Sequence, residues 1–162
     1  MQHGMWLELV WRDAEVLEVS IRARNANFAG SVCAYASAEQ LREFAGMIAG
    51  FPRTPSDTRE ASLGGFGSDW AGGAASMRFF CEDSVGHSFV EVQLESGQRT
   101  ADVAEFCRIL LSIEASGIDR FVPQIEALAR FTGNGHLTSG PVAVLPAWYL
   151  SAEGMLREDR SR

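Results

Sequence analysis

The chain has 162 residues, of which 46% are apolar and 22% are charged, and this balance suits one domain with a buried core and argues against wholesale disorder. Its formal net charge of −7 argues against non-specific binding to nucleic acid or to anionic membranes, because both depend on an excess of basic side chains. A basic protein partner remains compatible with this charge.

The N-terminal segment and the cysteines both bear on the cellular compartment. Residues 1–5 lack a cationic stretch followed by an apolar one, so no signal peptide is expected, and no apolar run reaches the ~20 residues of a membrane span. Cys33, Cys81 and Cys107 are odd in number and lie among apolar neighbours, which predicts buried, reduced thiols. With neither a signal peptide nor a membrane span expected, we expect a cytoplasmic protein. All 14 residues counted as Lys or Arg are arginine, which is typical of a GC-rich bacterial genome.

The first half of the chain has the pattern of three strands and a helix. Residues 6–11 alternate weakly, residues 16–24 alternate strictly between apolar and polar, and residues 28–36 form a third strand pattern. One apolar and one polar face are typical of an antiparallel sheet. Ser37 and Gln40 form a capping-box pattern for a helix over 38–49, which Gly50 is expected to end in a left-handed conformation.

A long connection is predicted over residues 53–73, with a short strand near 61–63. This segment is rich in Pro, Ser, Thr, Asp and Gly, and it holds Phe66 and Trp70 among several glycines. Two aromatic side chains on such a loop suit either a binding surface or plugs that tuck under the sheet.

The second half repeats the pattern with one ambiguity. Residues 75–82 and 87–95 predict a hairpin with its turn at 83–86. Residues 103–115 suit a strand and a helix equally, and we choose the strand because it makes the two halves match. An amphipathic helix follows from Ser116, with Pro123 expected to kink it or to delay its start to Phe121.

The apolar stripes of the two predicted helices match at a constant offset. Leu41 and Ile118, Phe44 and Phe121, and Ile48 and Ile125 are each 77 positions apart. We therefore expect one α+β domain over 1–130, mainly antiparallel, with a pseudo-repeat of βββα units over 5–51 and 74–130 and both helices on one side. Residues 131–162 follow as a C-terminal extension, and their apolar segment 142–150 favours a homodimer through this extension.

No catalytic residue, cofactor or metal site is predicted. The glycines at 64–67 are followed by a strand pattern and not by a helix, and the chain lacks both a Gly-Lys-Ser/Thr motif and a Gly-x-Ser-x-Gly elbow. Strand alternation would place Cys81 inside and His87 outside, so these two residues do not converge on a metal.

A partner surface is the stronger hypothesis. Glu18, Glu91, Gln93, Glu95 and Glu114 fall on the polar faces of predicted strands, where they would form an acidic surface beside Trp70 that steers a basic partner. The candidate partner surface comprises Phe66, Trp70, His87, Glu91, Glu95 and Glu114.

Four segments carry a resemblance to known proteins: the strand and helix of 31–51, the lead into a strand at 70–73, the turn at 83–87, and residues 111–128. In these the chain resembles small bacterial α+β proteins of uncharacterised families, some of them similar to WapI-type immunity proteins of polymorphic toxin systems. The resemblance implies a non-enzymatic protein that binds another protein, and it transfers no functional residue. The alternative is a small-ligand binder or enzyme with a cleft near Phe66, Trp70 and His87.

Overall fold

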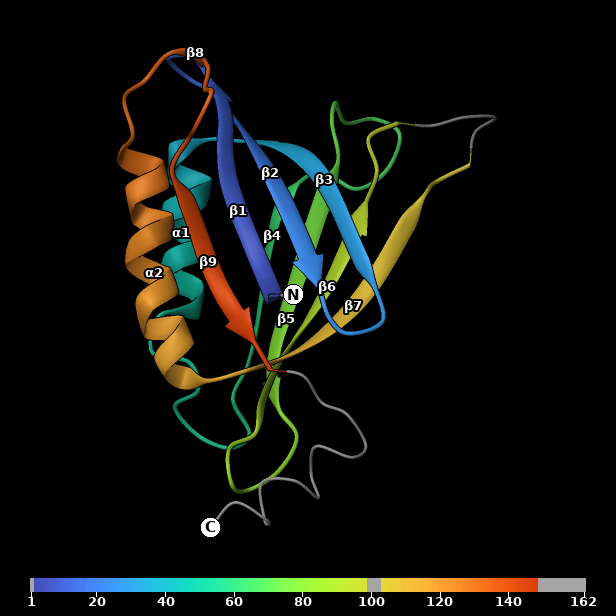
Figure 1. Cartoon of the computed structure of the whole chain (residues 1–162), viewed down its shortest axis with the longest axis vertical. Helices are drawn as coiled ribbons and strands as arrows, with labels where there is room; N and C mark the ends of the chain where they lie inside the picture. Colours follow the sequence, from blue (N-terminus) through green and yellow to red (C-terminus); the bar gives the residue numbers. More distant parts are fainter. Residues whose placement is uncertain (1, 99–102, 149–162) are drawn as a thin grey trace.

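Two antiparallel sheets and two helices make up the computed structural model, which describes residues 2–98 and 103–148 (Figure 1). Sheet A contains β1 (His3–Arg12), β2 (Leu17–Arg24), β3 (Ala29–Ala36), β8 (Gly135–His136) and β9 (Val142–Ala147). Sheet B contains β4 (Thr58–Gly64), β5 (Ala74–Cys81), β6 (Ser88–Glu95) and β7 (Phe106–Ile113). With helices α1 (Ala38–Ile48) and α2 (Ala115–Arg130), this confirms an α+β fold with mainly antiparallel sheet.

The sheets form two layers, and the helices lie side by side along one flank (Figure 1). The inner face of sheet A carries alternate residues of β1, such as Leu7 and Leu9, and the inner face of sheet B carries Phe79 and Val92; all four are fully buried. Helix α1 packs along β4 and α2 along β9, so the expected placement of both helices on one side is confirmed. The two sheets and the helix pair share one apolar core.

Each half of the chain supplies an edge strand to the other half. After α1 the chain continues into β4, which pairs with β5 of the second half. After α2 it continues through the two-residue β8 into β9, which pairs with β1 over six residues. The sheets are therefore completed by exchange, with β4-β5-β6-β7 in sheet B and β9-β1-β2-β3 in sheet A.

The offset of 77 holds at the strand–helix junctions. Strand β3 begins at Ala29 and ends at Ala36, and β7 begins at Phe106 and ends at Ile113, each 77 residues later. Residues 106–113 are thus a strand, and all eight pair with β6. The expected connection at 53–73 contains a longer strand than predicted, because all seven residues of β4 pair with β5.

Helix α1 begins and ends as its sequence signals predict. The Ser37 side chain accepts a hydrogen bond from the Gln40 backbone N–H, and the Gln40 side chain accepts one from the Ser37 N–H. The helix ends at Ile48, and Gly50 has a φ of 72°, the left-handed conformation that glycine adopts at little cost.

Helix α2 runs from Ala115 to Arg130 with Pro123 inside it, so the expected delay to Phe121 is wrong. Proline removes the bond to the carbonyl of Asp119 one turn earlier. Both Asp119 and Pro123 lie on the exposed face of the helix, where water can serve that carbonyl, and packing of Ile118, Phe121 and Ile125 holds the turn in place.

The boundary expected at residue 130 does not separate an extension from the domain. Strand β9 belongs to sheet A, and its Ala143 and Leu145 are fully buried in the common core. Trp148 continues this path and donates its backbone N–H to the Ser112 carbonyl of β7. The apolar segment that favoured a homodimer is thus used within the chain as far as residue 148, and residues 149–162 lie outside the described residues.

The cysteines are free thiols, as expected, but they are less buried than expected. Cys33 is exposed on the outer face of sheet A, because Ala34 and Ala36 are the β3 residues that point inward. Cys81 and Cys107 are half-buried at the margin of the core.

Candidate functional site

The outer face of sheet B carries apolar and charged side chains in adjacent positions. Strand pairing places Glu91 opposite Leu110 and Glu95 opposite Phe106. The side chains of Phe106 and Leu110 are 66% and 47% exposed, although their neighbours Ile109 and Leu111 point into the core. Strand β7 is thus apolar on both faces, and its outer face has no covering layer among the described residues.

The β4–β5 connection, which carries the predicted partner residues Phe66 and Trp70, meets this face at one end. The backbone N–H of Gly67 donates a 2.9 Å hydrogen bond to Glu95 Oε1, which ties the β4–β5 connection to the outer face of β6. The Trp70 ring packs so closely on Gly65 that no Cβ atom would fit there. Trp70 is 64% exposed, so it is not a plug under the sheet, whereas Phe66 is half-buried.

His87 and Glu114 lie at the opposite end of sheet B. His87 precedes the first residue of β6, and Glu114 follows Ile113, which pairs with that first residue, Ser88. The length of β6, about 23 Å at the usual rise per residue, separates them from Glu95 and the β4–β5 connection. Phe66, Trp70 and His87 therefore do not line one cleft.

His87 and Glu114 have structural partners of their own. His87 Nδ1 lies 2.5 Å from Asp83 Oδ2, and this contact is the main reason that the pKa of Asp83 is lowered. The Asp83 side chain also accepts the backbone N–H groups of Val85 and His87, so it holds the β5–β6 turn together. Glu114 is the N-cap residue of α2, and its carboxylate accepts a 3.4 Å hydrogen bond from the Ser116 hydroxyl but none from the helix backbone.

The charges on sheet B alternate in sign, so the expected acidic surface is wrong. Glu91 lies 3.7 Å from Arg78 and 3.9 Å from Arg108, and Arg108 also donates to Gln93. Glu18 lies on sheet A, paired opposite Tyr35 of β3. The outer face of sheet B is therefore a mixture of ion pairs and apolar side chains.

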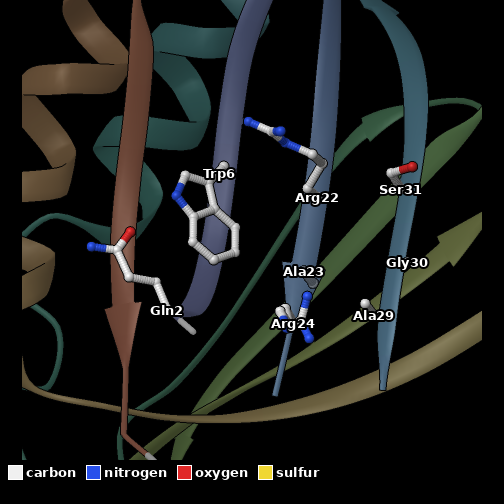
Figure 2. A pocket seen from close by; sticks show the side chains of 8 residues that line it. All are labelled: Gln2, Trp6, Arg22, Ala23, Arg24, Ala29, Gly30 and Ser31. Carbon is white, nitrogen blue, oxygen red and sulfur yellow. The ribbon is translucent and has the colours of Figure 1, made fainter. Parts of the chain in front are cut away.

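A hollow of about 620 Å³ lies on the outer face of sheet A (Figure 2). Trp6 of β1, Arg22 and Arg24 of β2 and Ser31 of β3 line it, together with Gln2. The alternation over residues 16–24 predicts that Arg22 and Arg24 lie on a polar strand face, but it does not predict this hollow. The hollow depends on which residues of β1 and β3 lie beside Arg22 and Arg24. The sequence pattern does not show how these strands pair with β2.

Phe106 and Leu110 are the residues of the sheet B surface that sequence reasoning missed. A signal for them was present, because residues 103–115 contained more apolar side chains than one buried face needs. That excess made the segment equally suited to a helix and a strand. Once the segment is a strand, the apolar residues that do not fit the buried phase must lie outside.

Comparison with protein-family models, curated proteins and solved structures finds no match for this chain. Within residues 2–98 and 103–148, no three His, Cys, Asp or Glu side chains converge in a way that would hold a metal ion. Over the same residues, neither helix has the length and apolar character needed to cross a membrane.

Proposed function

We propose that the chain is a non-enzymatic protein-binding module whose contact surface is the outer face of sheet B. This surface, named here the sheet B patch, comprises Trp70, Glu91, Glu95, Phe106 and Leu110. The observation that carries the proposal is the exposure of Phe106 and Leu110 on a face built of ion pairs, with the exposed Trp70 on the connection that Gly67 ties to Glu95. Exposed apolar side chains within a polar surround are typical of protein contact sites.

The sheet B patch combines large apolar side chains with charged ones, as the centre and the rim of a protein interface do. Trp70 and Phe106 offer large rigid rings, the kind of side chain that contributes most to binding energy at protein interfaces. Glu91 is already paired with Arg78 and Arg108. A partner with complementary charges can therefore cover these side chains without leaving any of the three charges unpaired. With a net charge of −7 on the chain, a basic partner is favoured.

The proposal is tested by purifying partners from the native cell with matched variants as bait. Phe106→Ser with Leu110→Ser removes the apolar side chains that β7 contributes to the sheet B patch, without touching the core. Val85→Ser is the matched control, because Val85 is 81% exposed at the β5–β6 turn, away from Phe106. We expect a stoichiometric partner with the wild type and with Val85→Ser, and its loss from the double variant. Equal recovery of that partner by all three baits contradicts the proposal.

The resemblance to immunity proteins makes toxin neutralisation the specific form of this proposal. A toxin encoded beside the gene is the partner to examine first. Co-expression of that toxin with the wild type should restore growth, and co-expression with the Phe106→Ser, Leu110→Ser variant should not. Full protection by the double variant would place the contact elsewhere on the molecule.

A further inference from the structure

The hollow on sheet A is built by the residues on either side of Arg24. Strand pairing places Gly4 of β1 and Ala29 of β3 beside Arg24, so neither neighbour has a side chain that reaches across it. A Cβ atom on Gly4 would lie 2.4 Å from the carbonyl oxygen of Leu145 in β9. The φ of Gly4 is 151°, a conformation that other residues rarely adopt, so this position requires glycine. The space beside Arg24 is thus fixed by the packing of β1 against β9.

The guanidinium of Arg24 is left without an acceptor in this space. Its Nε atom is buried and has no hydrogen-bond partner, and no ion pair joins Arg24 to another residue within the described part of the chain. A buried donor without an acceptor is costly, and arginine retains its charge at any physiological pH. The charge of the Arg24 guanidinium is therefore not compensated by any described residue at the hollow.

The other groups in the hollow suit the same kind of ligand. Arg22 is paired with Glu8 at 3.3 Å, and Ser31 adds a hydroxyl on the far side. Figure 2 shows the Trp6 ring on the same side of the sheet as both guanidinium groups, so the hollow joins a flat apolar surface to a cationic one. A volume of about 620 Å³ lies in the usual range for sites that bind small molecules.

We infer that this hollow binds a small molecule in which a carboxylate or phosphate group is attached to a flat apolar body. The oxyanion accepts hydrogen bonds from Arg24, and the flat body packs on Trp6. Two parallel N–H donors of a guanidinium match the paired oxygens of either anion. This site lies on the outer face of sheet A and is separate from the sheet B patch, so each is tested independently.

The test is a titration followed by the backbone amide signals of β1, β2 and β3 in NMR spectra. Phenyl phosphate and benzoate distinguish the two anions, inorganic phosphate lacks the flat body, and benzyl alcohol lacks the charge. We expect saturable shifts at Arg24 and Ser31 with at least one of the two aromatic anions, and weaker binding of inorganic phosphate and of benzyl alcohol. Arg24→Gln should weaken binding about ten- to hundredfold, the usual effect of a hydrogen bond to a charged group.

Two further variants make the result decisive. Arg24→Lys retains the charge but not the forked donor, and it should also bind more weakly than the wild type. Arg42→Gln, on α1 and paired there with Glu39, is the matched control and should bind as the wild type does. Equal affinity of the Arg24→Gln variant and the wild type, equal affinity for benzyl alcohol, or no saturable shift with either aromatic anion overturns the inference. If Arg24→Gln does not fold, the comparison of anionic and neutral ligands on the wild type decides alone.

Discussion

The ring of Phe44 in α1 meets the ring of Phe121 in α2 edge to face, with centroids 6.3 Å apart and ring planes at 85°. These two residues are 77 positions apart, the same offset that separates the ends of β3 and β7. Residues at matching distances from the two strands therefore contact each other at the centre of the helix pair. The two units share one core, in which Phe44 is 2% and Phe121 is 0% exposed.

Removal of either ring should destabilise the whole fold. We expect Phe44→Ala and Phe121→Ala each to lower the free energy of unfolding by about 3–5 kcal/mol, because each leaves a cavity in the shared core. In a double-mutant cycle the two rings should show a coupling of about 0.5–1.5 kcal/mol. Denaturant unfolding measures these values, with Phe106→Ala as an exposed control. Losses below about 1 kcal/mol would contradict the shared core.

The N-termini of the two helices offer a paired test of capping. Ser37 caps α1, and its equivalent 77 residues later, Glu114, makes no capping bond to α2. We expect Ser37→Ala to cost about 0.5–2 kcal/mol in denaturant unfolding. Glu114→Ser should stabilise the protein by up to about 1 kcal/mol, because it supplies the missing acceptor. A loss of stability in Glu114→Ser would show that the glutamate has another stabilising contact.

The free edge of β9 is protected by a side chain of α2. Gln124 Oε1 accepts a 2.7 Å hydrogen bond from the backbone N–H of Val144. Gln124→Met has a similar length and removes the acceptor, so we expect a loss of about 1–3 kcal/mol and faster hydrogen exchange at the Val144 amide. Arg120→Gln, on the exposed face of α2, is the control. Unchanged exchange at Val144 would mean that the edge needs no such partner.

The ion pair of Asp57 and Arg59 should contribute to acid unfolding. The hydrogen bond from Arg59, at 2.8 Å, is the main cause that lowers the pKa of Asp57 below its ordinary value of 3.8. Because the native state binds the charged carboxylate more tightly, this contribution is present above about pH 4 and is lost as the pH falls through the native pKa. The stability difference between the wild type and Asp57→Asn should shrink from about pH 7 to about pH 2. A difference that is constant with pH would contradict this role.

Cysteine labelling tests the surface position of Cys33. Partial burial and then the charge of Glu18 raise the pKa of Cys33 above its ordinary 9.0, so alkylation should be slow at neutral pH and should accelerate with rising pH. Glu18→Gln should increase the rate at Cys33 by less than about tenfold and leave Cys107 unchanged. Peptide mass spectrometry after brief labelling distinguishes the two cysteines. An equal effect on both would point to a general loosening of the fold.

The elements of this fold could be predicted because their signals are local. Alternation in β2, the Ser37–Gln40 capping box and the apolar stripe of α2 each depend on residues a few positions apart. The offset of 77 also followed from the sequence, and it correctly favoured a strand at 106–113. The predicted delay of α2 to Phe121 was wrong, because the effect of Pro123 on the helix depends on whether the Asp119 carbonyl can reach water.

The rest depends on which strands become neighbours. No local pattern indicates that β9 pairs with β1, so residues 142–147 were placed outside the domain. The sheet B patch and the hollow on sheet A could not be predicted for the same reason. Phe106 and Leu110 are exposed because no layer covers that face of β7 within the described residues, and the space beside Arg24 exists because Gly4 and Ala29 flank it.

The exchange of edge strands also sets the order in which the molecule can be completed. Strand β1 leaves the ribosome well before its partner β9, which lies more than a hundred residues later in the chain. Sheet A must therefore wait with one flank of β1 open until β9 has been synthesised. Contacts this distant in sequence slow folding, and the nascent first half is the stage most exposed to wrong strand pairing.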